Sequence, residues 1–231
     1  MESRVKVHVY CAKANAWTPD ATLRDLALLQ PDERERASRF RFDADRRMYV
    51  GAHGLLRRAL SQHAPVRPAD WRFSGKEGER PEIAEPDRSP RLRFSLSHTR
   101  SVAACAIVPE LDVGFDVEDL TREAPMEVAE RFAPSERAAL AALGPGPREE
   151  LFFAYWTLKE AYMKARGLGL AIALDQIVFD VSRATIEIAF GEGCPDDEKA
   201  WRFESWPVSD TCRAALAVKT GQELEIVRSI G

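Results

Sequence analysis

A short apolar stretch of the chain carries two carboxylates that could bind a metal ion. Residues 113–119 read VGFDVED, so Asp116 and Glu118 stand where a buried strand would carry apolar residues. Because side chains alternate across a strand, these two point to one side and the apolar residues between them point to the other. Gly114, just ahead of them, leaves room for a ligand or another backbone to come close.

Two carboxylates side by side repel each other and require a cation or a shared proton. A set of oxygen ligands suits a hard ion such as Mg²⁺, with Mn²⁺ as its alternative, better than it suits zinc. An exposed edge strand on which the pattern D-x-E occurs by chance is the competing interpretation. The strand alone does not decide between the two.

Further chemical groups lie on the most clearly predicted helix of the chain. Residues 148–166 contain neither glycine nor proline, and the sequence Gly167-Leu168-Gly169 follows them. Within this helix Trp156, Glu160 and Lys164 are spaced by four residues, which places them on one face. Alone, this spacing indicates a surface Glu–Lys pair beside an aromatic anchor. Together with the carboxylate strand, it indicates a shared site.

An arginine-rich segment precedes these motifs. Its periodicity predicts a charged helix from Pro31 to Arg39 and a longer helix from Asp43 to Leu60. Its arginines either pair with nearby acids on solvated faces or bind phosphate, and the sequence leaves both open. They are Arg34, Arg36, Arg39, Arg41, Arg46, Arg47, Arg57 and Arg58.

A predicted hairpin carries a serine next to a histidine. Residues 92–98 read LRFSLSH and alternate as a strand, and an apolar strand follows at residues 102–108. The pair Ser97-His98 could suggest a nucleophile, but adjacent strand residues point to opposite faces and the chain has no G-x-S-x-G elbow. His98 is therefore interpreted as a structural hydrogen-bonding residue or a phosphate ligand.

Composition and cysteine usage limit the partners and the compartment. A net charge of −4 and a pI near 5.7 argue against general affinity for nucleic acid or for a membrane surface. The four cysteines show no C-x-x-C spacing, so we expect reduced thiols and a cytoplasmic location. The first residues lack the apolar segment of a signal peptide, and no apolar run approaches the length of a membrane span.

The order of helices and strands repeats along the chain. A helical pattern at residues 42–60 is followed by a strand pattern that begins at Arg93. The same order recurs about 110 residues later, with a helical pattern at residues 152–170 and a strand pattern that begins at Arg202. The sequence therefore predicts an α+β fold of two similar α/β lobes, residues 1–112 and 113–231. We expect antiparallel sheets, a long helix in each lobe, a pseudo-twofold relation between the lobes and an active site in the cleft between them. Two internal lobes favour a monomer.

Three motifs in this order resemble the 4′-phosphopantetheinyl transferase superfamily, in its larger, pseudo-dimeric (surfactin-synthetase-activator) type. They are FSLSH at residues 94–98, GFDVE at 114–118, and FAYWTLKEA at 153–161 followed by Lys164 and GLGL at 167–170. The resemblance implies Mg²⁺-dependent transfer of the 4′-phosphopantetheine arm of coenzyme A to a serine of an apo acyl or peptidyl carrier protein. Adenosine 3′,5′-bisphosphate is the second product.

The resemblance also assigns residues. Asp116, Glu118 and Glu160 correspond to metal ligands; Glu160 is in addition the candidate base for the serine proton, and Lys164 is placed to neutralise the leaving phosphate. Glu136 is a secondary acidic position. The candidate contacts to coenzyme A are Arg36, Arg47, Arg80, Ser97, His98, Asp116, Lys159 and Lys164.

Two departures put the phosphate contacts of the first lobe in doubt: Glu33 replaces a lysine, and Tyr49 replaces a small hydroxyl residue. Arginine suits phosphate well, so Arg34, Arg46 or Arg47 could compensate. The alternative function is a catalytically silent module of the same fold that binds carrier protein or coenzyme A. Another Mg²⁺-dependent phosphoryl or nucleotidyl enzyme that uses the same carboxylates is disfavoured because the chain has no G-x-x-x-x-G-K-[ST] loop.

Overall fold

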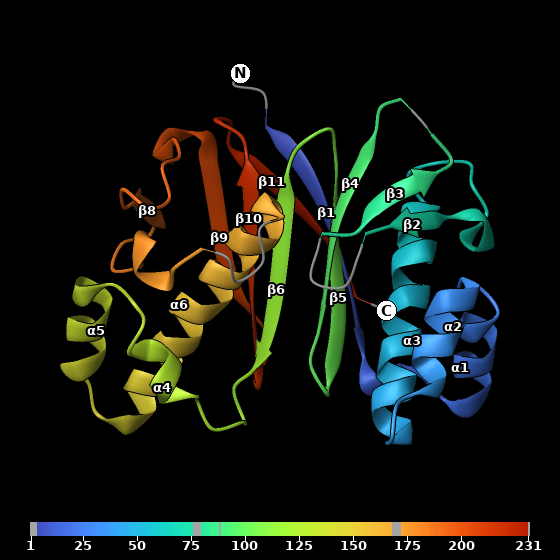
Figure 1. The fold of residues 1–231 in the computed structure, drawn as a ribbon, viewed down its shortest axis with the longest axis horizontal. Helices are drawn as coiled ribbons and strands as arrows, with labels where there is room; N and C mark the ends of the chain where they lie inside the picture. The colour runs from blue at the N-terminus through green and yellow to red at the C-terminus, as the bar shows by residue number, and fades with distance from the viewer. Residues whose placement is uncertain (1–3, 76–79, 88, 168–171, 231) are drawn as a thin grey trace. The chain divides into compact units, whose positions relative to one another are not determined.

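The structure, a computed structural model of the 231-residue chain, describes residues 4–75, 80–87, 89–167 and 172–230. Its backbone contacts divide the chain into two compact units (Figure 1). We call residues 6–111 with 225–231 the N-terminal unit, and residues 1–5 with 112–224 the C-terminal unit. Within the described ranges, no helix combines the length and the apolar character needed to cross a membrane.

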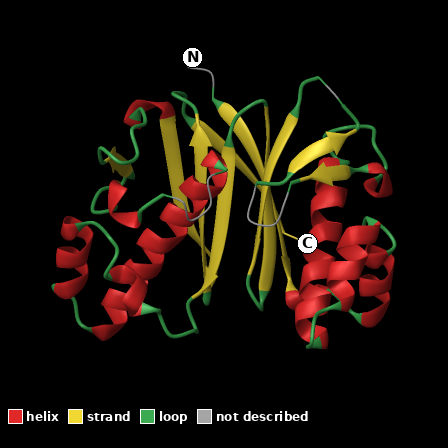
Figure 2. Cartoon of the chain, viewed as in Figure 1, coloured by secondary structure: helices red, strands yellow, loops and turns green. Residues whose placement is uncertain are grey.

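The N-terminal unit is built on a four-stranded sheet in the order β11-β1-β5-β4. Helix α3 packs on β5 and β4, and α1 and α2 pack on α3 (Figure 2). A two-stranded ribbon, β2-β3, completes the unit. Its elements are β1 (Val5–Lys13), α1 (Pro19–Leu26), α2 (Pro31–Ser38), α3 (Asp43–Leu60), β2 (Arg72–Ser74), β3 (Glu82–Glu85), β4 (Leu92–His98), β5 (Val102–Pro109) and β11 (Leu224–Ile230).

The last strand of the chain pairs with the first. Division of the sequence at residue 112 placed β11 in the second lobe, whereas in the structure β11 lies beside β1 at the edge of the N-terminal sheet. The alternation of apolar residues shows that this segment is a strand. It does not show which strand is its neighbour, because that pairing joins residues more than two hundred positions apart.

The C-terminal unit has a three-stranded antiparallel sheet, β6-β10-β9, covered on one face by helix α6. Strand β6 pairs with β10 so that Asp116 lies opposite Ala215 and Glu118 lies opposite Arg213. The elements are β6 (Val113–Asp119), α4 (Met126–Ala129), α5 (Pro134–Ala141), α6 (Pro145–Arg166), β7 (Ile177–Asp180), β8 (Glu187–Phe190), β9 (Trp201–Ser209) and β10 (Cys212–Lys219).

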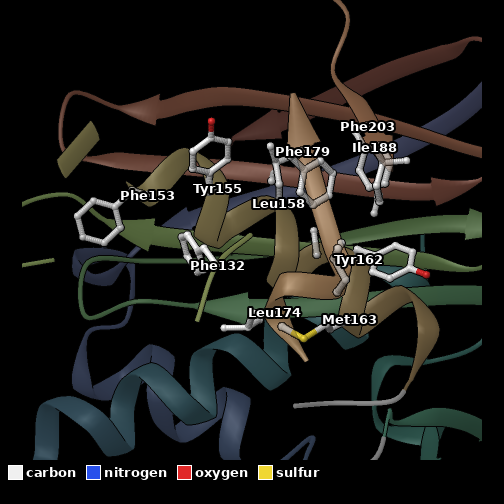
Figure 3. Close-up of a cluster of buried hydrophobic side chains, with 14 of the residues drawn as sticks. Phe132, Phe153, Tyr155, Leu158, Tyr162, Met163, Leu174, Phe179, Ile188 and Phe203 are labelled. Carbon is white, nitrogen blue, oxygen red and sulfur yellow. The ribbon is translucent and has the colours of Figure 1, made fainter. Parts of the chain in front are cut away.

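Helix α6 is the centre of this unit's core. Figure 3 shows Leu158 and Tyr162 of α6 among Phe179, Ile188 and Phe203 of the surrounding strands. From residue 152 to residue 165 every side chain is buried except three, at positions 156, 160 and 164, which are only partly exposed. The face predicted from the four-residue spacing is therefore the one partly open face of an otherwise buried helix.

Helix α6 begins three residues earlier than the sequence predicts. The helix starts inside the Gly-Pro-Gly-Pro run at residues 144–147, where Gly144 is the N-cap and both prolines lie in the first turn. Proline is tolerated there because the first N–H groups of a helix have no intrahelical acceptor. The α+β class, the antiparallel sheets and one long helix in each unit, α3 and α6, are confirmed.

Candidate active site

Strand β6 and helix α6 approach each other at Gly114. A Cβ atom at this position would lie 1.8 Å from the carbonyl oxygen of Ala161 and 2.5 Å from the backbone nitrogen of Ala165. The neighbour for which Gly114 leaves room is thus the backbone of α6 itself. Since Asp116 and Glu118 follow on the same face of the strand, this contact brings them to the partly open face of α6.

We expect Gly114→Ala to lower the free energy of unfolding by about 3 kcal/mol or more, because no flexible side chain can yield to the added methyl group. Urea unfolding of the variant measures the loss. Gly146→Ala is the matched control, since Gly146 lies in the same helix and no atom comes within 4 Å of a Cβ there. Equal stability of the two variants would show that β6 and α6 are not packed as described.

Asp116 is held by a lysine of the facing helix. Its carboxylate is almost fully buried, and its Oδ1 accepts a hydrogen bond of 2.6 Å from the Nζ of Lys164. The two groups come from β6 and α6 and lie 48 residues apart in the sequence. This ion pair connects the predicted carboxylate strand to the predicted helix face.

Glu118 is bound on both of its oxygens. Its Oε1 accepts a hydrogen bond of 2.6 Å from the indole of Trp156, and its Oε2 accepts one of 2.8 Å from Arg122. Burial, followed by the charge of Asp116, raises the pKa of Glu118 above its ordinary value. Sequence reasoning missed Arg122, although a basic residue four positions after Glu118 is a signal for such a pair.

Glu160 completes a group of three carboxylates. Burial, and then the negative charges of Asp116 and Glu118, raise its pKa to about 7, while Lys164 opposes the shift. Among the residues that the structure describes, no donor or cation lies in hydrogen-bond reach of its carboxylate. Glu160 is therefore the carboxylate of this group that is placed to accept a proton.

The group fits a hard divalent cation by charge and by donor type. The three side chains offer only oxygen atoms, and their mutual repulsion is what a cation would relieve. In the described part of the chain, however, no group of three or more His, Cys, Asp or Glu side chains has an arrangement that could hold a metal ion. Asp116 and Glu118 are instead each paired with a cation of the chain itself, Lys164 and Arg122.

The N-terminal unit contains a pocket of about 540 Å³ that is lined by residues of α2, α3 and β4. Alternate residues of β4, Phe94, Leu96 and His98, line one side of it, and Arg36 and Tyr49 line another. The guanidinium of Arg36 lies 5.7 Å from the centre of the Tyr49 ring. A cation, an imidazole and aromatic surfaces together suit a phosphorylated aromatic ligand.

Glu33, the acid that departs from the family pattern in this pocket, is already neutralised. It forms an ion pair with the fully buried Arg57, and its Oε1 lies 2.8 Å from the Nδ1 of His53. Burial would raise the pKa of Glu33, but the hydrogen bond and charge of His53 and the charge of Arg57 outweigh it and lower the pKa to about 2. Its charge is therefore shielded from an anion in the pocket.

This depressed pKa predicts a loss of stability in acid. Because Glu33 gains its partners on folding, its contribution of about 3 kcal/mol is present above its ordinary pKa of 4.5 and disappears as the pH falls toward about 2. We expect Glu33→Gln to be less stable than the wild type by about this amount near neutral pH. Urea unfolding should show the difference shrinking between about pH 4.5 and pH 2; a constant difference would contradict the assignment.

Comparisons with known proteins bear on both units. A family model described as 4′-phosphopantetheinyl transferase superfamily matches residues 112–218, and one described as 4′-phosphopantetheinyl transferase, N-terminal, matches residues 15–110. The 4′-phosphopantetheinyl transferase HetI of Nostoc sp. is 34% identical over 203 residues, which span 87% of this chain and 83% of HetI. The chain belongs to the 4′-phosphopantetheinyl transferase superfamily.

A second curated relative agrees with this assignment. A phosphopantetheinyl transferase of Thraustochytrium sp. is 32% identical over 213 residues, covering 85% of this chain and 74% of that protein. Among solved structures, the holo-[acyl-carrier-protein] synthase of Thermotoga maritima matches half of this chain and 65% of its own, with 25% identity and a TM-score of 0.38. The predicted family and the enzyme class, a 4′-phosphopantetheinyl transferase, are confirmed by the family models and the named relatives.

One predicted contact of this phosphopantetheinyl transferase is placed elsewhere by the structure. Lys159 does not join the carboxylates; its ammonium is fully buried, lies 2.8 Å from Glu136, and donates to the carbonyls of Leu174 and Ile177. Glu136 in turn accepts a hydrogen bond from the backbone N–H of Phe179. Neighbouring helix residues differ by about 100°, so Lys159 enters the core of the transferase when Glu160 faces the strand.

We expect Lys159→Met to reduce stability, because it leaves the Glu136 carboxylate buried without its cation. Loss of one partner of a buried ion pair costs about 3–5 kcal/mol of unfolding free energy. Urea unfolding measures this loss, and the exposed Lys199→Met is the control. Unchanged stability together with weakened coenzyme A binding, measured by calorimetry, would instead restore Lys159 as a cofactor contact.

The remaining predicted contacts of the transferase fall into two groups. Arg36 and His98 line the pocket of the N-terminal unit. Arg47 instead forms an ion pair of 2.8 Å with Asp43, Arg80 forms one of 2.9 Å with Glu82, and Ser97 is buried on the other face of β4. The alternation of strand residues accounts for the separation of Ser97 from His98.

Proposed function

We propose that this chain transfers the 4′-phosphopantetheine moiety of coenzyme A to a serine of an apo acyl or peptidyl carrier protein. The serine oxygen forms a bond to the β-phosphorus of the coenzyme A pyrophosphate, and the bond from that phosphorus to the bridging oxygen breaks. The products are the holo carrier protein and adenosine 3′,5′-bisphosphate. The serine proton passes to a base of the enzyme.

The convergence of β6 and α6 is the observation that carries this proposal. Asp116, Glu118, Glu160 and Lys164 come from two elements and lie together because Gly114 permits direct contact of strand and helix. A module that only binds carrier protein or coenzyme A has no need of three converging carboxylates, of which Glu118 and Glu160 have raised pKa values. The catalytic function is therefore preferred to the silent module.

The carboxylates are the proposed holders of Mg²⁺. Asp116, Glu118 and Glu160 would supply its protein ligands, and the bound ion would supply positive charge against the pyrophosphate, which the carboxylates alone would repel. Mn²⁺ has similar ligand preferences and is the alternative ion.

Glu160 is the proposed base for the serine proton, and the contacts of the neighbouring carboxylates support this role. Asp116 is engaged by Lys164, and Glu118 is engaged by Arg122 and Trp156, whereas Glu160 is the carboxylate of the three placed to accept a proton. Lys164 lies one helical turn after Glu160 and can neutralise charge on the leaving phosphate. Base and cation then act from the same face of α6.

The pocket of the N-terminal unit is the proposed position of the nucleotide end of coenzyme A. Arg36 and His98 offer donors to phosphate, and Tyr49 with Phe94 offers aromatic surface to the base. Arg47, Arg80, Ser97 and Lys159 remain weaker candidates, since each is paired or buried away from this pocket.

Mass spectrometry of apo carrier proteins tests the proposed function. The purified chain is incubated with coenzyme A, Mg²⁺ and a panel of apo carriers from fatty-acid, polyketide and nonribosomal-peptide synthesis. We expect at least one carrier to gain the mass of phosphopantetheine, and chelation of the metal to stop the gain. Binding of carrier or coenzyme A without any mass gain across the panel would favour the silent module.

A further inference from the structure

Each strand carboxylate of the site is paired with a cation from another part of the chain. Lys164 lies 2.6 Å from Asp116, and Arg122 lies 2.8 Å from Glu118. Lys164 belongs to α6 and Arg122 to the turn that follows β6. Asp116 and Glu118, the two proposed metal ligands on β6, are thus already paired with positive charges of the chain.

The two cations are more exposed than the carboxylates with which they pair. The side chains of Asp116 and Glu118 are 6% and 16% exposed, whereas those of Lys164 and Arg122 are 31% and 44% exposed. An ion that binds to either carboxylate must therefore come close to the positive charge that is already paired with it. A metal ion and the resident cation would repel each other strongly there, because water is partly excluded around the carboxylates.

Arg122 is held in this position by more than its ion pair. Its guanidinium lies 5.3 Å from the centre of the Phe153 ring, a cation–π contact. The turn before it is fixed by Asp119, whose Oδ1 accepts hydrogen bonds from the backbone N–H and the hydroxyl of Thr121. The ion pair and the ring contact together hold the partly exposed Arg122 side chain against the site.

We propose that Arg122 and Lys164 are resident counter-cations that occupy the metal-binding carboxylates until a pyrophosphate group binds. A pyrophosphate attracts both cations, Arg122 through its guanidinium fork and Lys164 as a point charge, and so frees Glu118 and Asp116. The divalent ion then binds well only together with the pyrophosphate. The identification of that ligand as coenzyme A rests on the proposed function. The competition of Arg122 and Lys164 with a metal ion for the carboxylates does not depend on it.

Binding of Mn²⁺ to the free protein tests this directly, without any turnover. The electron paramagnetic resonance signal of free Mn²⁺ decreases as the ion binds, and titration gives its dissociation constant. We expect Arg122→Gln to bind Mn²⁺ at least about fivefold more tightly than the wild type, because one competing charge is gone. Arg122→Lys keeps the charge and should behave like the wild type.

Arg183→Gln is the matched control, since Arg183 forms an exposed i,i+4 pair with Glu187 and its loss changes the net charge equally. Its affinity for Mn²⁺ should remain within about twofold of the wild type. Unchanged or weaker binding by Arg122→Gln, including no binding by any variant, would overturn the proposal. A gain equal to that of Arg183→Gln would also overturn it, because it would reflect net charge alone.

Inorganic pyrophosphate provides the second arm of the experiment. With pyrophosphate bound, the wild type should bind Mn²⁺ tightly and its difference from Arg122→Gln should shrink; a difference of the same size would contradict release of Arg122. Failure of the carrier-protein assay would leave these metal titrations unaffected. The two proposals can therefore fail separately.

Discussion

Replacement of Asp116 by alanine is expected to reduce phosphopantetheine transfer by at least about a thousandfold. Replacement of a residue that only hydrogen-bonds to a metal ligand lowers metal affinity or activity by about 10–100-fold. We expect a larger loss of activity for Asp116, because it is itself a proposed ligand and is the most buried of the three carboxylates. The variant also removes the partner of Lys164. The measurement is the mass increase of an apo carrier protein under single-turnover conditions.

Asp210→Ala is the control for this change, because Asp210 is exposed in the turn between β9 and β10 of the same unit. It should transfer at the rate of the wild type. Urea unfolding of Asp116→Ala must show a folded protein for the comparison to hold. A folded Asp116→Ala variant with near-normal transfer would remove Asp116 from the metal site.

Glu160→Gln is expected to slow transfer by roughly a hundredfold to a thousandfold while leaving coenzyme A affinity within about threefold. Glutamine keeps the size and the polar character of the side chain but cannot accept the serine proton. Single-turnover rates measure the first effect, and calorimetric titration with coenzyme A measures the second.

The split between rate and affinity decides the role of Glu160. Weaker coenzyme A binding at an unchanged bound-state rate would show that Glu160 only holds the cofactor. Asp175→Asn, an exposed acid of the same unit, should alter neither quantity and controls for the change in net charge.

The central site could be predicted because local patterns determine its geometry. Strand alternation places Asp116 and Glu118 on one face, and the four-residue spacing places Glu160 and Lys164 on another. The structure brings these faces together. The presence of Gly114 indicated a close neighbour, although the sequence could not distinguish a ligand from the backbone of α6.

The predicted contacts that lie apart from the pocket and from the carboxylate group have other partners in the fold. Lys159 was expected near the cofactor, but its environment is set by Glu136 and by carbonyls of residues 174–177. Arg47 and Arg80 are paired with nearby acids that compete with any ligand. Charge type alone cannot tell an arginine that binds phosphate from one that binds aspartate.

Other expectations stay predictions. They are the boundary at residue 112, the cleft between two lobes related by a twofold axis, the monomeric state, the cytoplasmic location and the class of carrier protein. Sequence patterns support each of them through local features or through family resemblance. Sedimentation of the purified chain would measure the oligomeric state.

Because Gly114 contacts Ala161 and Ala165, a redesign of this enzyme must keep the number of residues in helix α6 unchanged. Insertion of a single residue between Trp156 and Ala161 would rotate the preceding part of α6 by about 100° relative to the anchored part. Trp156 would then leave Glu118 while Lys164 stayed in place. Loop grafts and deletions are therefore best confined to segments outside this anchored stretch of the helix.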